Sequence, residues 1–186
     1  MMRYGIYMVI MVVLWTACKP AEDATRATGG KQKQAVLRLQ LTSTSTWCGG
    51  AEPPPWLLED LATPKALPSK KVYVRKGATN DLSAPIIAEG TSNETGTVWL
   101  SLQPGTYSLV FDNKKDSTLY RSILTTIGNG NKDYAPVDKE CLSKWLHTPE
   151  LLFTLTADTL DTTFNVFQYC PWQSMPCTSY LGPMPP

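Results

Sequence analysis

The stretch at residues 90–111, GTSNETGTVWLSLQPGTYSLVF, decides the fold class. From Val98 to Leu102 apolar residues alternate with other residues, which is the period of a strand with one buried face. A second alternating run follows Pro104-Gly105, a turn in which proline fixes one dihedral angle and glycine accepts a positive φ. The stretch therefore predicts short strands that are joined by tight turns.

The same patterns along the chain predict about eight strands in total, arranged as a two-sheet sandwich. The further expected strands lie at residues 35–41, 71–76, 85–89, 119–127, 152–156 and 163–168. Within the second of these, Val72 and Val74 are expected to point inward, with Tyr73 and Arg75 outward. Two short helices are expected, one at residues 56–61 and one that begins after Asp138 as its cap.

The sequence also resembles a known group of folds. A Thr-x-x-Glu-x-Gly turn that starts at Thr91, followed by an alternating strand and by Pro-Gly-Thr-Tyr-x-Leu from Pro104, is similar to the prealbumin-like (transthyretin-like) sandwich domains. These include the carboxypeptidase regulatory-like modules and the Cna-B-type repeats, and the resemblance covers roughly residues 35–110. It implies an all-β, prealbumin-like sandwich of about seven to eight strands with one or two short helices in insertions, in an accessory module.

Charge argues against a nucleic-acid partner. The chain has 186 residues, with 17 Lys and Arg against 16 Asp and Glu. Arg3 is the only charged side chain before Cys18, so its removal with a leader peptide leaves equal numbers of basic and acidic residues. Binding to nucleic acid needs a basic face that displaces counterions, and this composition does not supply one.

The N-terminus predicts export and a lipid anchor. Residues 1–17 have a basic start and an apolar run that is too short for the roughly 20 residues of a membrane helix, which is typical of a signal peptide. Small residues followed by Cys18 resemble a bacterial lipobox, although Trp15 stands where leucine is usual. Acylated Cys18 would anchor the chain in the lipid bilayer, which is the expectation for an outer-membrane lipoprotein. The alternative is an ordinary secretory signal with an incidental cysteine.

Residues 18–34 have no apolar periodicity and are expected to form a flexible tether. The polar residues directly after Cys18 either form a solvated linker or resemble the surface-export signal of some Gram-negative lipoproteins. Residues 35–186 are then expected to form a single β-sandwich domain, whose C-terminal tail wraps over the sandwich. The domain would face the periplasm or the cell exterior.

Four cysteines remain after Cys18, namely Cys48, Cys141, Cys170 and Cys177. An even number in an exported chain predicts two disulfides, for which three connectivities exist. We favour Cys48–Cys141 and Cys170–Cys177, of which the second closes a small proline-containing loop. The spacings lack a Cys-x-x-Cys pair, which argues against a metal site.

Nothing in the sequence predicts an enzyme or a cofactor. His147 is the only histidine, and Asp158 and Asp161 fall in an expected hairpin loop, where aspartate is common for turn reasons. The hydroxyisourate hydrolases are prealbumin-like enzymes, but their Tyr-Arg-Gly-Ser ending is absent because Tyr180 is followed by Leu181. The histidines of that family are absent as well.

The tryptophans are the remaining ligand-binding candidates. Trp47 and Trp56 belong to an expected insertion at residues 47–68, and Trp172 belongs to the tail at residues 170–186. Exposed tryptophans stack on sugar rings or anchor protein partners, whereas buried ones close the ends of a small core. The sequence therefore leaves two functions open, a non-catalytic accessory, adhesion or protein-interaction module that binds an envelope protein, or a carbohydrate-binding module that binds a polysaccharide.

Overall fold

The computed structural model describes residues 34–127, 130–156 and 158–183. The expected signal peptide, Cys18 and the tether up to residue 33 lie outside these residues. The described elements are β1 Ala35–Ser45, α1 Pro55–Ala62, β2 Lys65–Ala66, β3 Lys71–Lys76, β4 Ala88–Thr91, β5 Thr97–Leu102, β6 Gly105–Val110, η1 Asp112–Lys114, α2 Thr118–Thr126, α3 Lys139–His147, β7 Leu151–Leu155, β8 Leu160–Gln168 and η2 Pro171–Gln173.

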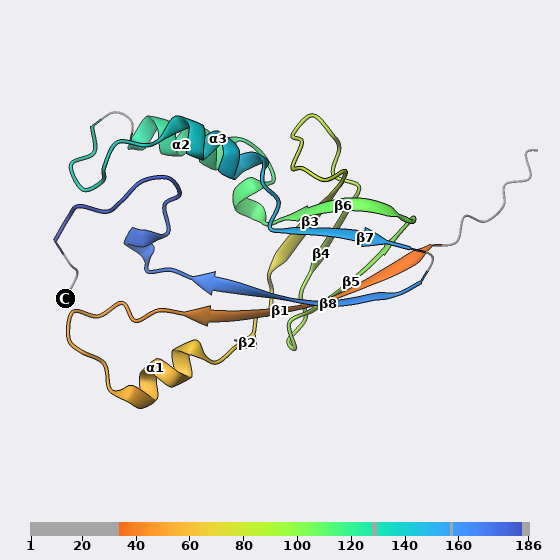
Figure 1. Ribbon diagram of the computed structural model, residues 1–186, viewed down its shortest axis with the longest axis horizontal. Helices are drawn as coiled ribbons and strands as arrows, with labels where there is room; N and C mark the ends of the chain where they lie inside the picture. Colours follow the sequence, from red (N-terminus) through yellow and green to blue (C-terminus); the bar gives the residue numbers. More distant parts are fainter. Residues whose placement is uncertain (1–33, 128–129, 157, 184–186) are drawn as a thin grey trace, which may run out of the picture. The chain divides into compact units, whose positions relative to one another are not determined.

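The described chain is mostly β and forms a sandwich of two sheets (Figure 1). One sheet has the order β2-β1-β5, and β8 pairs with β1 in parallel on its other side. The second sheet has the order β4-β3-β6-β7 and is antiparallel throughout. The core lies between the sheets, because alternate residues of β1 and β5 are buried against residues of β3, β6 and β7.

The turn before β5 explains why glycine stands at position 96. Gly96 has φ 82°, a left-handed conformation that L side chains rarely adopt. An added Cβ would also clash with the carbonyl oxygen of Leu41. Asn93 closes the turn, because its side-chain oxygen accepts hydrogen bonds from the N–H groups of Thr95 (3.1 Å) and Thr97 (2.8 Å). The geometry of this turn therefore explains why asparagine stands at position 93 and glycine at position 96.

Several expected elements are present, with shifted ends. β1 continues through the threonine and serine residues that follow Leu41, and α1 follows the proline run. α3 begins after Asp138, whose carboxylate accepts hydrogen bonds from the N–H groups of Glu140 and Cys141, each at 3.0 Å. β4 begins at Ala88 rather than at residue 85, because its pairing with β3 starts at that residue.

The expected strand at residues 119–127 is wrong, because this segment forms helix α2. Leu119, Ile123 and Ile127 are four residues apart, so a helix places all three on one face, where they pack in a cluster that also contains Leu142 of α3. The carboxylate of Asp116 accepts a hydrogen bond from the N–H of Thr118 at 2.8 Å, which satisfies one of the free donors at the start of the helix.

The outward side chains of β3 are not solvated. Tyr73 is 6% exposed and Arg75 is 4% exposed. The segment after β6 covers them, because the hydroxyl of Tyr73 donates to Asp112 at 2.7 Å and the guanidinium of Arg75 donates to the carbonyl of Lys115 at 2.6 Å. Strand alternation therefore gives the correct direction of these side chains but not their burial.

The favoured disulfide pairing is wrong, although all four cysteines are paired. Cys48 pairs with Cys170, and Cys141 pairs with Cys177. The reason is the parallel pairing of β1 and β8, which brings the residues directly after both strands to the same end of the sheet. The second disulfide fixes the C-terminal tail to α3.

The tail packs against the helical side of the fold rather than wrapping over the sandwich. The N–H of Asp138 donates to the carbonyl of Cys177 at 3.0 Å, and the N–H of Ala135 donates to the carbonyl of Ser179 at 2.8 Å. Figure 1 shows this tail running from the end of β8 toward α2 and α3. The tail therefore packs beside α3 and the segment that precedes it.

Candidate functional site

A groove lies between β8, α3 and the tail, and we call it the aromatic groove. It consists of two adjoining hollows with volumes of about 620 Å³ and 550 Å³. The hollows share five lining residues, Trp145, Glu150, Tyr169, Ser174 and Pro176. Phe111, Phe164 and Phe167 add further aromatic surface to the larger hollow.

Strand alternation in β8 brings aromatic side chains to both sides of this edge. Phe164 points inward and packs with its ring centroid 6.0 Å from that of Phe111. Phe167 points outward and is 46% exposed, and Tyr169 beyond the strand end is 59% exposed. Their rings meet edge to face with centroids 4.7 Å apart, a favoured geometry for aromatic pairs. The groove therefore presents apolar rings to solvent rather than hiding them.

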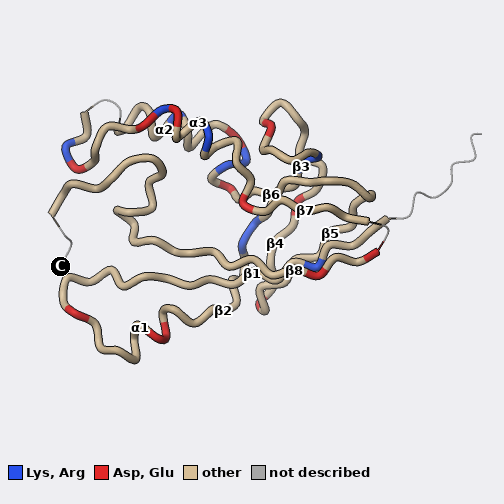
Figure 2. Tube along the Cα trace, in the orientation of Figure 1, with Lys and Arg blue, Asp and Glu red and all other residues tan. Residues whose placement is uncertain are grey.

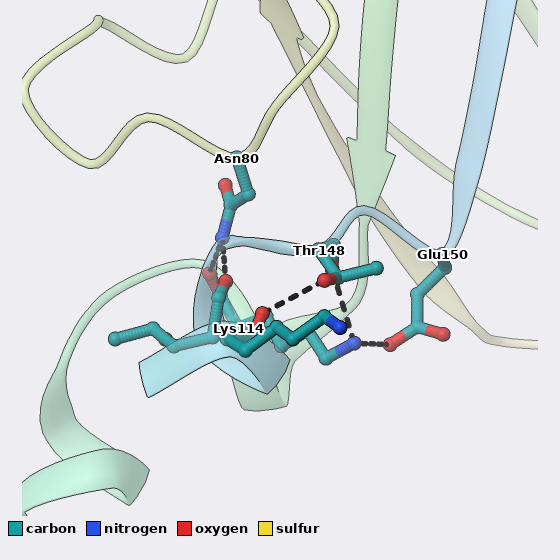
Figure 3. A network of polar contacts seen from close by, with 6 residues as sticks. Asn80, Lys114, Thr148 and Glu150 are labelled. Carbon is teal, nitrogen blue, oxygen red and sulfur yellow. Dashed lines mark hydrogen bonds and ion pairs between the residues drawn. The ribbon is translucent and has the colours of Figure 1, made fainter. Parts of the chain in front are cut away.

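A buried ion pair lies at the base of the groove (Figure 3). The ammonium of Lys114 is 2.8 Å from the carboxylate of Glu150, and it donates a hydrogen bond to the carbonyl of Thr148 at 3.1 Å. It also lies 5.0 Å from the centre of the Trp145 ring, within the range of a cation–π interaction. Lys114 is the last residue of η1, and Glu150 directly precedes β7.

Asn80 connects the end of η1 with the end of α3 through hydrogen bonds. Its fully buried amide nitrogen donates to the carbonyls of Lys114 and Leu146, each at 2.8 Å (Figure 3). Its backbone carbonyl lies 3.1 Å from Nδ1 of His147, the only histidine. One side chain thus fixes the end of α3 and the end of η1 in a single position.

A second polar cluster lies under the segment after β6. The hydrogen bond to Asp112 and burial raise the pKa of Tyr73 above its ordinary value. Burial lowers the pKa of Arg75, although Asp81 and Asp116 partly oppose that effect. The charge of neighbouring Tyr73 is the main cause of the raised pKa of Lys115. These groups hold the covering segment on β3, and none of them lines the aromatic groove.

The two aspartates considered for acid–base chemistry do not lie in the expected hairpin, because the connection from β7 to β8 crosses from one sheet to the other. Residue 158 lies in this connection, whereas Asp161 lies within β8. Asp161 lies 3.7 Å from the guanidinium of Arg38, and both side chains are exposed. Within residues 34–127, 130–156 and 158–183, no three His, Cys, Asp or Glu residues are grouped to hold a metal ion.

The three candidate tryptophans differ in exposure and form no common site. Trp56 on α1 is 67% exposed and Trp47 is 37% exposed, whereas Trp172 is half-buried. Trp172 packs with its ring centroid 6.5 Å from that of Tyr180, and the indole N–H of Trp47 donates to the carbonyl of Ala51 at 2.8 Å. In the part of the chain that the structure describes, no ring contact joins any two of the three.

Sequence reasoning missed the residues that form the aromatic groove. Lys114 stands in a charged turn, and Trp145 is part of an ordinary amphipathic helix, so neither signals a site. One available signal is the stretch from Thr162 to the end of the chain, which is rich in aromatic residues and has no Lys, Arg, Asp or Glu. Figure 2 shows β8 beyond its start and the described tail without charged residues.

Comparisons with known proteins give no family. No protein-family model matches the chain, and no curated protein matches it. Matching solved structures include the minor pilin GBS52 of Streptococcus agalactiae, at 13% identity and a TM-score of 0.35, over 74% of this chain and 45% of the pilin. The shaft pilin SpaA of Lactobacillus rhamnosus GG (D295N mutant) matches at 14% identity and a TM-score of 0.37, over 74% of this chain and 51% of that one.

An enzyme is also among the matching structures. (S)-allantoin synthase matches at 12% identity and a TM-score of 0.37, over 80% of this chain and 43% of the enzyme. The chain thus spans about half the length of these structures or less. TM-scores this low carry no argument about function, so the fold description rests on the sheet topology. The helices in the described part of the chain include no candidate for a membrane span.

Proposed function

We propose that the protein is a non-catalytic interaction module of the bacterial cell envelope, built on a prealbumin-like sandwich and anchored through lipidated Cys18. The observation that carries this proposal is the aromatic groove, where Phe167 and Tyr169 are about half exposed beside a chain segment without charges. Exposed aromatic residues in a concave site are typical anchors for a protein partner.

Two further observations support the proposal. Both disulfides join segments far apart in sequence, with separations of 122 and 36 residues, and such bonds persist in oxidising compartments outside the cytoplasm. The buried ionisable groups at the groove are engaged in structural contacts, as in the pair of Lys114 and Glu150. A site for binding therefore fits the groove better than a site for proton transfer.

The test is chemical crosslinking of the intact protein in native envelopes, followed by mass spectrometry of the captured protein and glycan. A stoichiometric envelope protein whose crosslinks map to the groove is expected. Loss of that partner in a Tyr169→Ser variant, with retention in a Trp56→Ser variant on the distant α1, would locate the contact. Capture of polysaccharide with no protein would contradict the proposal.

A carbohydrate-binding module is the second candidate, and the exposure of Trp56 and Trp47 favours it. Flat indole rings in solvent stack on sugar rings. The test is binding of envelope polysaccharide to single Trp→Ala variants at positions 47, 56 and 172, measured by isothermal titration calorimetry. Equal affinity for all three variants and the unmodified chain would exclude these tryptophans as the sugar site.

A further inference from the structure

We infer that the free edge of β8 is the docking site for an extended peptide strand of another protein. The strand would add to the sheet beside β8 and place alternate side chains in the aromatic groove. This inference rests on the proposed function, because that function gives the groove a protein partner.

The free edge of β8 offers unpaired backbone groups. The carbonyl of Gln168 accepts a hydrogen bond from the N–H of Thr46 on β1 at 3.3 Å. Backbone groups alternate in direction along a strand, so those of Thr163, Asn165 and Phe167 point away from β1. Within the described residues, no strand pairs with this second edge of β8.

This edge of β8 lacks the usual protection against strand pairing. Natural edge strands are kept short or carry lysine, proline or a bulge. β8 is nine residues long, whereas the edge strands β4 and β7 of the other sheet have four and five residues. Residues 162–168 include no charged residue and no proline, and Figure 2 shows this part of β8 without charge.

The aromatic groove lies directly beside this edge. All six residues from Phe164 to Tyr169 line the larger hollow, and Phe111 and Trp145 line it as well. Phe164 and Val166 are only partly buried and pack against the core, so the sandwich is open here. A strand added beside β8 would direct every second side chain toward these two residues, which favours apolar residues at those positions.

The aromatic groove carries unpaired positive charge. The lining of the two hollows contains three lysines, Lys70, Lys114 and Lys144, and the carboxylate of Glu150. Glu150 is paired with Lys114, and neither of the other two lysines has an ion-pair partner in the described part of the chain. The groove is therefore complementary to a peptide that carries carboxylates as well as alternating apolar residues.

The probe is a synthetic nine-residue peptide that alternates valine and threonine and has glutamate at both ends. The experiment uses the mature chain with both disulfides intact and follows amide hydrogen exchange by NMR. Addition of the peptide at up to about 1 mM is expected to slow exchange at Thr163, Asn165 and Phe167. The same peptide with its central residue replaced by proline is expected to give no protection, because proline cannot donate to the ladder.

The matched variants test the edge itself. Asn165→Pro removes an N–H that points away from β1, so it is expected to weaken peptide binding at least about tenfold while the fold is kept. Thr154→Pro is the control on the free edge of β7. The carbonyl of its partner Thr106 accepts a hydrogen bond from the N–H of Gly77 at 2.9 Å, so the backbone groups of Thr106 face β3. The N–H of Thr154 therefore points away from β6. The control is expected to bind the peptide with unchanged affinity.

Three outcomes would overturn the inference. The first is no protection from exchange at the three amides, and the second is equal affinity of the Asn165→Pro variant and the unmodified chain for the peptide. The third is protection without peptide that depends on protein concentration, which would assign the edge to a second copy of the chain. The exchange measurement on the unmodified protein does not depend on whether a variant folds. If the envelope partner crosslinks at the groove but Asn165→Pro retains it, the strand-docking inference fails while the proposed function stands.

Discussion

Lys114 and Glu150 form an ion pair of 2.8 Å in which the lysine side chain is only 5% exposed and the glutamate side chain 23% exposed. The pair links η1, which follows β6, to the start of β7. Removal of two charges from water is costly, and mutual attraction offsets that cost only while both partners are present. The pair therefore fixes the relative position of two segments at the base of the aromatic groove.

Substitution of Glu150 is expected to destabilise the fold. Glu150→Gln leaves a buried ammonium without its counter-charge, and we expect the free energy of unfolding to fall by about 2 to 3 kcal/mol, less than for a fully buried pair because Glu150 is partly solvated. Urea denaturation measures the change. The control is Glu52→Gln, an exposed residue outside the groove, whose effect should stay within about 0.5 kcal/mol. Equal stability of both variants would show that the ion pair contributes nothing.

Asn80 is expected to be a strong determinant of stability for its size. Asn80→Ala leaves the buried carbonyls of Lys114 and Leu146 without their donor, which costs about 1 to 3 kcal/mol for each unsatisfied group. Asn80→Asp keeps the shape but replaces the donor with an acceptor, so it should destabilise at least as much. Thermal unfolding followed by circular dichroism measures both variants. An Asn80→Asp variant as stable as the unmodified chain would contradict the assigned hydrogen bonds.

The two disulfides are expected to contribute unequally to stability. The chain-entropy relation gives about 5 kcal/mol for Cys48–Cys170 and about 4 kcal/mol for Cys141–Cys177, because the first closes the longer loop. Denaturation of the two paired Cys→Ser variants tests this order. Peptide mapping without reduction tests the pairing itself, and a linked peptide that contains Cys48 and Cys141 would contradict it.

Acid is expected to destabilise the protein through two aspartates. Hydrogen bonds from the hydroxyl and the N–H of Thr118 lower the pKa of Asp116, and those from Ser83 lower the pKa of Asp81. Their contribution to stability is present above their ordinary pKa of 3.8 and is lost as the pH falls through the lowered folded values. An Asp81→Asn, Asp116→Asn double variant should show a shallower acid limb in denaturation midpoints at pH 5 and below. An unchanged acid limb would show that neither aspartate contributes to the loss of stability in acid.

Alkali is expected to act through Tyr73. Its folded pKa is raised, first by the hydrogen bond to Asp112 and then by burial, so the stabilising protonated form is fully present below pH 10.0 and is lost as the pH rises through the folded value. The absorbance of tyrosinate near 295 nm should show one phenol that titrates late, and this phenol should be missing in Tyr73→Phe. Its presence in the variant would assign the late titration to another tyrosine.

Sequence periodicity was sufficient for most strands but not for α2. β5 and β6 follow from alternation and from turns with Gly96 and Pro104, all of which are local signals. The segment of α2 contains threonine and isoleucine, which favour strands, and only the four-residue spacing of Ile123 and Ile127 indicates a helix. Packing against Leu142 of α3 favours the helix, and that contact joins residues that are far apart in the sequence.

The site was much less predictable than the fold, for the same reason. The pairing of Cys48 with Cys170 depends on the parallel register of β1 and β8, which no local pattern encodes. The pair of Lys114 and Glu150 joins residues on two separate segments, and lysine in a charged turn is normally solvated. The three candidate tryptophans could be identified from the sequence, but their separation in space could not be predicted from it.

The parallel pairing of β1 with β8 has a mechanical consequence. The strands pair over nine positions, from Leu37 with Leu160 to Ser45 with Gln168. A force that pulls on the start of β1 and the end of β8 in opposite directions loads all of these hydrogen bonds together in shear, rather than opening them one by one as a zipper. The bond between Cys48 and Cys170 lies just beyond the last pair, so the tension reaches a covalent link before the ladder can slide apart.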